Sequence, residues 1–127
     1  MTKFEADNSQ FRIALYGDSD LDPYNDQLLS EALRLKMIDP KVDFWLADIE
    51  VFEKRQGIGE KVISVYEEKA IDSRRYLKNS GINSFRIVGI VKADFEELDG
   101  VVSWYAKMGY AIKPKSEYIF VEKTLEL

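Results

Sequence analysis

The chain has 127 residues, the length of one domain, which is long enough to bury a hydrophobic core without disulfides. Its net charge of −5 argues against non-specific nucleic-acid binding, which depends on clusters of lysine and arginine. The absence of cysteine and histidine excludes disulfides, thiolate metal sites and the commonest metal ligand, so we expect no metal centre.

The first ten residues are polar and acidic, without the apolar core of a signal peptide. No apolar run approaches the ~20 residues of a membrane span. We therefore predict one domain over residues 1–127, no membrane partner and a cytoplasmic location.

Residues 1–10 carry little pattern, and we expect no regular structure there. Residues 11–16 alternate, with Phe11, Ile13 and Leu15 on one face, which predicts a half-buried strand. A turn follows, and then Asp22 and Pro23 resemble a helix start, with an apolar stripe running on to residue 37. One strand and one helix therefore precede residue 42.

Residues 42–52 form an apolar run on both faces, as in a central strand covered on either side. Asp48 and Glu50 interrupt this run near its end. The simplest interpretation is that they mark the exit of the strand into solvent.

Residues 58–80 form the longest helical pattern, and the sequence around Gly81 resembles a C-cap. Its apolar stripe comprises Val62, Tyr66, Ala70 and Leu77, widened by Ile58, Val65 and Ile71. Its charged residues are predicted to be a solvated face: Glu67, Glu68, Lys69, Arg74, Arg75 and Lys78.

Residues 84–91 predict another strand, and Asp99 could cap a short helix that ends at Gly109. Residues 110–113 and 118–125 predict two strands, antiparallel because their connection is too short for a crossover. The order of elements predicts an α/β or α+β domain with three layers and a mixed sheet.

The turn between the central strand and the long helix reads Lys54-Arg55-Gln56-Gly57-Ile58-Gly59. The first amides of a helix lack internal partners, and the helix dipole favours an anion there. Gly57 and Gly59 have no Cβ, so a ligand can approach the backbone closely. The turn is either a phosphate site or a strand-to-helix turn that uses glycine for its shape.

A second segment lies at a suitable distance along the chain: Trp104-Tyr105-Ala106-Lys107-Met108-Gly109-Tyr110. The turn resembles the pyrophosphate loop of the GNAT N-acetyltransferase superfamily. The second segment resembles that family's aromatic-Tyr-Glu-Lys-Leu-Gly-Phe helix and strand. The resemblance covers about residues 43–125 and implies a mixed sheet with splayed central strands flanked by helices.

The resemblance implies that acetyl-coenzyme A is the cofactor. Its pyrophosphate would lie on the loop and first helical turn, at Lys54, Arg55, Gln56, Gly57, Ile58, Gly59 and Glu60. Its pantetheine arm would contact the backbone of Ile49 and Val51 in the gap between the splayed strands. Two departures from the family pattern are Lys54, where arginine or glutamine is usual, and Arg55, where glycine is common.

The family's general acid aligns with Tyr105, whose alternative is an aromatic packed in the core. A phenol suits this role because its unperturbed pKa of ~10 lies above that of a thiol. Candidates for the base that deprotonates the amine are Asp43, Asp48 and Glu50, and Asp48 is preferred among them. A bulge in this strand would change which of their side chains face the cleft.

The resemblance implies an acyltransferase that moves acetyl from acetyl-coenzyme A to a primary amine of a small molecule, peptide or protein. One alternative is a catalytically inactive GNAT-fold module that binds or regulates and can keep coenzyme A. Acetylation of aminoacyl-tRNA is disfavoured by the acidic charge, and we predict no nucleic-acid partner. The reduced N-terminal part and the exposed aromatics suggest self-association, and monomer and homodimer both stay open, with monomer as the default.

Overall fold

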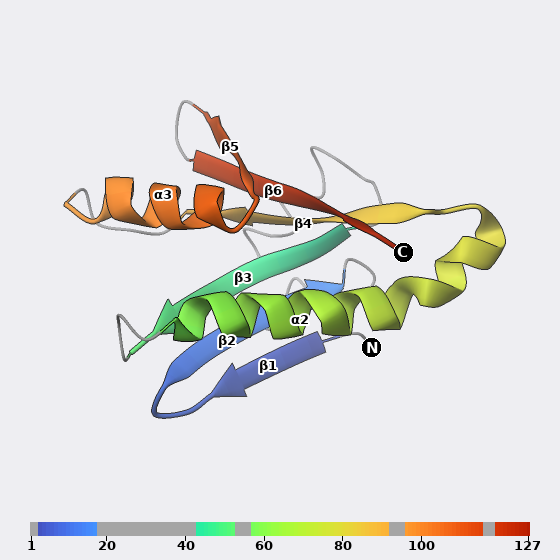
Figure 1. The fold of residues 1–127 in the computed structure, drawn as a ribbon, viewed down its shortest axis with the longest axis horizontal. Coiled ribbons are helices and arrows are strands. Elements are labelled where there is room, and N and C mark those ends of the chain that lie inside the picture. The colour runs from blue at the N-terminus through green and yellow to red at the C-terminus, as the bar shows by residue number, and fades with distance from the viewer. Residues whose placement is uncertain (1–2, 18–42, 53–56, 92–95, 116–118) are drawn as a thin grey trace, which may run out of the picture.

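The structure, a computed structural model, describes residues 3–17, 43–52, 57–91, 96–115 and 119–127. A six-stranded sheet in the order β1-β2-β3-β4-β6-β5 forms its frame (Figure 1). The strands are β1 (Lys3–Asp7), β2 (Phe11–Gly17), β3 (Asp43–Val51), β4 (Ser84–Ile90), β5 (Ala111–Pro114) and β6 (Ile119–Glu126). The sheet is mixed: β3 and β4 are parallel neighbours, and the other four junctions are antiparallel.

Helix α2 (Ile58–Arg74) connects the two parallel strands and continues as a 3₁₀ helix, η2 (Arg75–Ser80). Glycines in the left-handed region bracket this unit, with φ of 68° at Gly57 and 83° at Gly81. The predicted C-cap is therefore confirmed. Among the described residues, no helix combines the length and apolarity needed to cross a bilayer.

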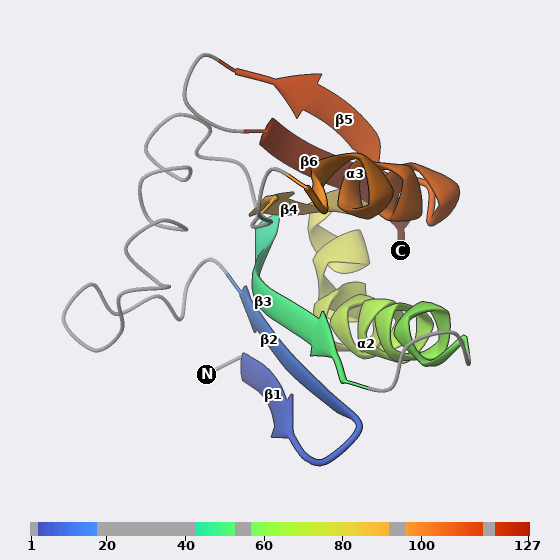
Figure 2. The same ribbon diagram turned by 90° about the vertical axis from the view of Figure 1, so that its left-hand side faces the viewer.

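Helix α3 (Leu98–Lys107) lies on the same face of the sheet as α2 (Figure 2). Its N-cap position is Glu97, and no side chain caps it, so the prediction that Asp99 is the cap was wrong. Asp99 instead lies in the first turn, where its charge complements the helix dipole. Gly109, at φ 91°, follows the helix as predicted.

The main core lies between the two helices and the sheet. Its largest fully buried side chains include Phe44, Ile13, Leu15, Ile87 and Val121. Two smaller clusters lie on the opposite face of the sheet, one around Tyr16 and Ala47 and one around Trp45 and Val88. The strand predicted over residues 11–16 is present, but Ala14 and Tyr16 are also buried, so it is not half-exposed.

The beginning of the chain differs from the prediction. Residues 3–7 form an edge strand, β1, that pairs antiparallel with β2. Two of the described strands therefore precede β3, where one was predicted. The helix predicted from Asp22 to residue 39 falls outside the described residues.

The charged face predicted for the long helix is partly wrong. Glu67 and Arg74 are 7% and 4% exposed, whereas Val65, assigned to the apolar stripe, is 51% exposed. Both oxygens of the Glu67 carboxylate accept hydrogen bonds of 2.9 Å from Lys123 Nζ on β6. Lys123 Nζ also donates to the Met108 carbonyl at 2.9 Å. This buried ion pair joins α2 to the opposite half of the sheet.

We predict that Glu67→Gln destabilises the protein by about 2 kcal/mol, because it leaves the Lys123 ammonium, only partly exposed, without its counter-charge. The measurement is urea unfolding at neutral pH. Glu68→Gln is the matched control, since the neighbouring carboxylate is exposed, and it should change stability by less than about 0.5 kcal/mol. Equal stability of the two variants would contradict a structural role for the Glu67–Lys123 pair.

Candidate functional site

The two parallel strands at the centre of the sheet, β3 and β4, are paired over only part of their length and then diverge. Pairing between β3 and β4 covers only Asp43 to Leu46 on β3 and Arg86 to Gly89 on β4. Beyond Leu46, residues 47–51 of β3 keep β2 as a neighbour, but none of the described strands pairs with their other edge. Figure 2 shows the two strands diverging. The result is a gap in the sheet that opens toward the start of α2.

A bulge in β3 decides which side chains border this gap. Leu15 pairs with Leu46 and Ala14 with Asp48, so Ala47 is an extra residue in β3. Side chains paired across antiparallel strands lie on one face, so Asp48 shares the face of Ala14, away from the helices. Ile49 lies on the opposite face, where it packs against the main core. Without the bulge, alternation from Leu46 would have placed Asp48 under the helices.

Arg12 holds two of the predicted catalytic carboxylates together. Its Nε lies 2.5 Å from Asp48 Oδ2 and its Nη2 lies 2.7 Å from Glu50 Oε2. The hydrogen bond to Asp48 raises the pKa of Arg12, which stays charged. The prediction that these carboxylates mark the exit of the strand into solvent is therefore wrong for Asp48, whose side chain is 19% exposed. The side chain of Glu50 is 53% exposed. The side chain of Asp43, the third candidate base, lies outside the described residues.

The predicted phosphate turn leads into a helix start that no side chain of the described residues caps. Gly57 occupies the N-cap position in the left-handed conformation, and only the Lys61 amide bonds back to its carbonyl, at 3.3 Å. The first turn of α2 thus presents amides and partial positive charge, as an anion site requires. The loop residues Lys54, Arg55 and Gln56 lie outside the described residues.

Helix α3 covers this first turn. A Cβ added at Gly59 would lie 3.0 Å from Cζ2 of Trp104 and 3.3 Å from Cγ2 of Val51. The glycine therefore permits the indole ring to lie directly on the helix backbone. Glu60, predicted to bind cofactor, forms an ion pair of 2.7 Å with Lys107.

Tyr105 lies on the helix face of the sheet, 6% exposed. Its ring makes edge contacts with Trp104 and Tyr110, at centroid distances of 5.0 Å and 5.6 Å. Burial, and then the negative charge of Asp48, raise its pKa well above the usual value, so the phenol keeps its proton. The charge of Asp48 thus reaches the Tyr105 phenol, although the Asp48 side chain lies on the other face of the sheet.

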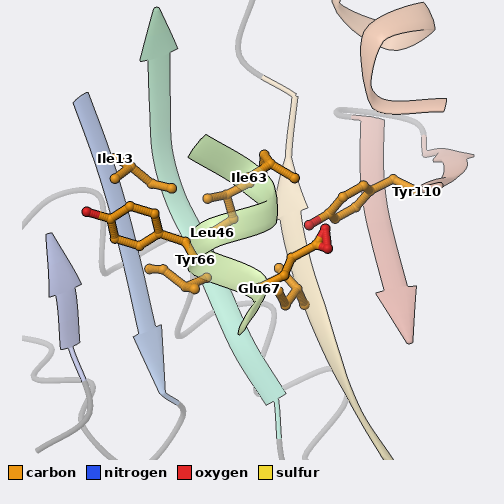
Figure 3. A pocket seen from close by; sticks show the side chains of 8 residues that line it. Ile13, Leu46, Ile63, Tyr66, Glu67 and Tyr110 are labelled. Carbon is orange, nitrogen blue, oxygen red and sulfur yellow. The ribbon is translucent and has the colours of Figure 1, made fainter. Parts of the chain in front are cut away.

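A narrow crevice lies beneath α2 next to Leu46, where pairing with β4 ends (Figure 3). Five aliphatic side chains line it together with Tyr66, Glu67 and Tyr110, and it has no room for a water molecule. Tyr110 is 4% exposed, and its hydroxyl has no hydrogen-bond partner within the described part of the chain. In Figure 3 this hydroxyl points toward the Glu67 carboxylate. Burial raises the pKa of Tyr110, and Glu67 and Tyr105 raise it further.

The structure brings Val51 at the end of β3 and Trp104 of α3, the neighbour of Tyr105, against Gly59 in the first turn of α2. Sequence reasoning missed three contributors to the site: Arg12, the indole contact of Trp104 with the first turn of α2, and the hydroxyl of Tyr110. Arg12 had a signal, since a cation stands in an otherwise apolar strand. The bulge had none, because it depends on pairing with β2.

No protein-family model, curated protein or solved structure matches the chain.

We predict an alkaline instability that arises from Tyr105 and Tyr110. Their pKa values are raised in the folded state, while unfolded tyrosine ionises near pH 10. The contribution of the two phenols to the free energy of unfolding is fully present below about pH 10. Above that pH it is lost, at up to ~1.4 kcal/mol per pH unit for each phenol.

The measurement is urea unfolding at pH 8 and pH 11. A variant with Tyr105→Phe and Tyr110→Phe should lose less stability between the two pH values than the parent. Tyr76→Phe is the control, because Tyr76 is 60% exposed, and it should follow the parent. If the stability of the doubly substituted variant falls as steeply with pH as that of the parent, Tyr105 and Tyr110 are not the source of the alkaline instability.

Two glycines on the helices should respond differently to alanine. A Cβ at Gly100 in α3 meets no atom within 4 Å, so Gly100→Ala should stabilise by about 0.5–1 kcal/mol through helix propensity. Gly59→Ala should lose that gain, because the added methyl meets the Trp104 ring at 3.0 Å. Thermal unfolding compares the two, and an equal gain at both positions would contradict the contact between Trp104 and α2.

Proposed function

We propose that the chain is an N-acetyltransferase that binds acetyl-coenzyme A in the gap between β3 and β4. The observation that carries the proposal is the position of this gap. The only parallel junction among the described strands ends at Leu46, while β3 continues unpaired on that edge to Val51 and α2 begins at Ile58. Ligands of α/β sheets commonly bind beyond the carboxyl ends of such strands.

The residues present fit this cofactor in two respects. The first-turn amides after Gly57 offer an anion site suited to a pyrophosphate. At residues 47–51, one edge of β3 has backbone N–H and C=O groups that pair with no described strand. The backbone of Ile49 and Val51 could therefore form hydrogen bonds with the amides of a pantetheine arm.

Bound acetyl-coenzyme A would supply a thioester whose carbonyl carbon an amine attacks. Tyr105 holds a proton at its phenolic oxygen on the helix side of the gap and can give it to a departing sulfur. Asp48 or Glu50, on the other face, can take the proton that an ammonium acceptor must lose, directly or through water. The protein would hold the two reactants together in line, which is a large part of such catalysis.

A second function, a module that binds coenzyme A without catalysis, is favoured by the ion pairs of Arg12. One guanidinium occupies both Asp48 and Glu50, which competes with their use as a base. Binding of coenzyme A with no turnover of a broad panel of amines would favour this module. Turnover of any amine would decide for the enzyme.

Calorimetric titration with acetyl-coenzyme A tests the shared claim. Gly57→Leu should weaken binding at least about tenfold, since a side chain would stand against the amides of the first turn. Gly81→Leu is a matched control at the other end of the helical unit. Both glycines have positive φ and open space around a Cβ, so strain is comparable, but Gly81→Leu should bind as the parent does.

If the parent protein does not bind acetyl-coenzyme A at millimolar concentration, the proposal is wrong. If an acceptor is found, Tyr105→Phe should lower turnover more than affinity. Undiminished turnover in that variant would remove Tyr105 from the acid role.

A further inference from the structure

The two edges of the sheet differ in how they are protected against pairing with another chain. At one edge, β5 has four residues and ends at Pro114, which has no backbone N–H to donate. At the other edge, β1 has five residues, contains no proline and pairs with β2 without a bulge. Prolines and bulges are common means of blocking a strand edge, and β1 has neither.

Alternate backbone groups of β1 point away from β2. The hairpin between the two strands closes with the N–H of Asn8, which donates to the carbonyl of Phe11 at 3.0 Å. Bonded and non-bonded pairs alternate along an antiparallel ladder, so the backbone groups of Phe4 and Ala6 are the ones bonded to β2. Three residues therefore direct their N–H and C=O groups to the outer edge: Lys3, Glu5 and Asp7.

None of the described helices or strands covers this outer edge. The sheet ends at β1, and Figure 1 and Figure 2 show no other described element beyond it. Helix α2 packs on β2, β3 and β6. Backbone groups at such an edge are satisfied by water or by a strand that another chain supplies.

The charges along the outer edge of β1 are complementary to themselves. If two copies of β1 pair antiparallel about a two-fold axis at Glu5, Lys3 of each copy lies opposite Asp7 of the other. In this register each outward N–H meets an outward carbonyl, whereas a shift by one residue would oppose it to a group already bonded to β2. Opposite charges directly across a pair of strands stabilise the pairing.

The remaining pairs of this register are compatible with it. On the helix face, Phe4 lies opposite Ala6 of the second copy, and both side chains are only half-buried in the single chain. Glu5 lies opposite itself, but each carboxylate accepts a hydrogen bond from the Tyr16 hydroxyl and lies 3.3 Å from the Lys3 ammonium. These contacts limit the repulsion between the two carboxylates.

We propose that the chain forms a homodimer through β1, in which two copies pair antiparallel with Lys3 opposite Asp7 and the two sheets become one. Each copy contributes one short strand, so the association is weak and depends on concentration. The proposal goes beyond the proposed function and is independent of coenzyme A binding.

Sedimentation velocity of the full chain, from micromolar to millimolar concentration, tests the dimer. The average mass should rise from that of one chain toward that of two. Lys3→Glu and Asp7→Lys each set like charges opposite one another, so each variant alone should associate about tenfold more weakly. An equimolar mixture of the two variants should restore the association, because position 3 of each then meets the opposite charge at position 7 of the other.

Lys115→Glu is the control for net charge, since it makes the same change as Lys3→Glu but lies beyond β5, at the opposite edge of the sheet. It should associate as the parent does, and thermal unfolding checks that every variant folds. Amide hydrogen exchange locates the contact. Exchange at Glu5 and Asp7 should slow as the concentration rises, whereas exchange at Ala6, already bonded to β2, should not.

A chain that stays monomeric at millimolar concentration would overturn the proposal. So would association that neither single variant weakens, or a loss that the mixture does not restore, because the copies would then meet by another surface. Slow exchange at Glu5 and Asp7 in a monomer would show that another segment of the same chain covers the edge, and it would overturn the dimer as well.

Discussion

The end of backbone pairing between β3 and β4 is the constraint on which the rest of the site depends. Pairing stops at Leu46, and the bulge at Ala47 follows at once. A backbone that leaves a parallel junction exposes groups that need partners, either protein or ligand. The same bulge turns Asp48 to one face and Ile49 to the other. One irregularity therefore creates the gap and decides which chemistry lies on each side of it.

Three contacts bridge the two halves of the molecule across that gap. The Glu67–Lys123 pair fixes the middle of α2, whereas Trp104 and Lys107 lie over its first turn. Removing one partner of a buried ion pair strongly destabilises a protein, because the other charge stays buried without a counter-charge. An exposed ion pair contributes little to stability, so its partners can separate readily. The Glu67–Lys123 pair thus anchors α2 in the interior, whereas the Lys107–Glu60 pair lies at the surface.

Much of the fold could be predicted from local pattern. The apolar run of β3, the short connection of β5 to β6, and the glycines that follow η2 and α3 each predicted an element near its observed bounds. Edge strand β1 was missed, because charged residues alternate with Phe4 and Ala6 and resemble a polar loop. Glu67 was misplaced because its partner lies 56 residues away. Register and pairing at this range are tertiary facts that a local pattern does not contain.

Around the candidate site, the start of α2 after Gly57 was predictable from the local sequence, whereas the pairing of Arg12 with Asp48 and Glu50 was not. The direct test of the central claim is to record backbone amide NMR spectra of the chain as coenzyme A is added. The account predicts that the largest shifts fall at residues 47–51 and 57–60, on the two sides of the gap. Shifts confined to other residues, or none at millimolar ligand, would contradict it.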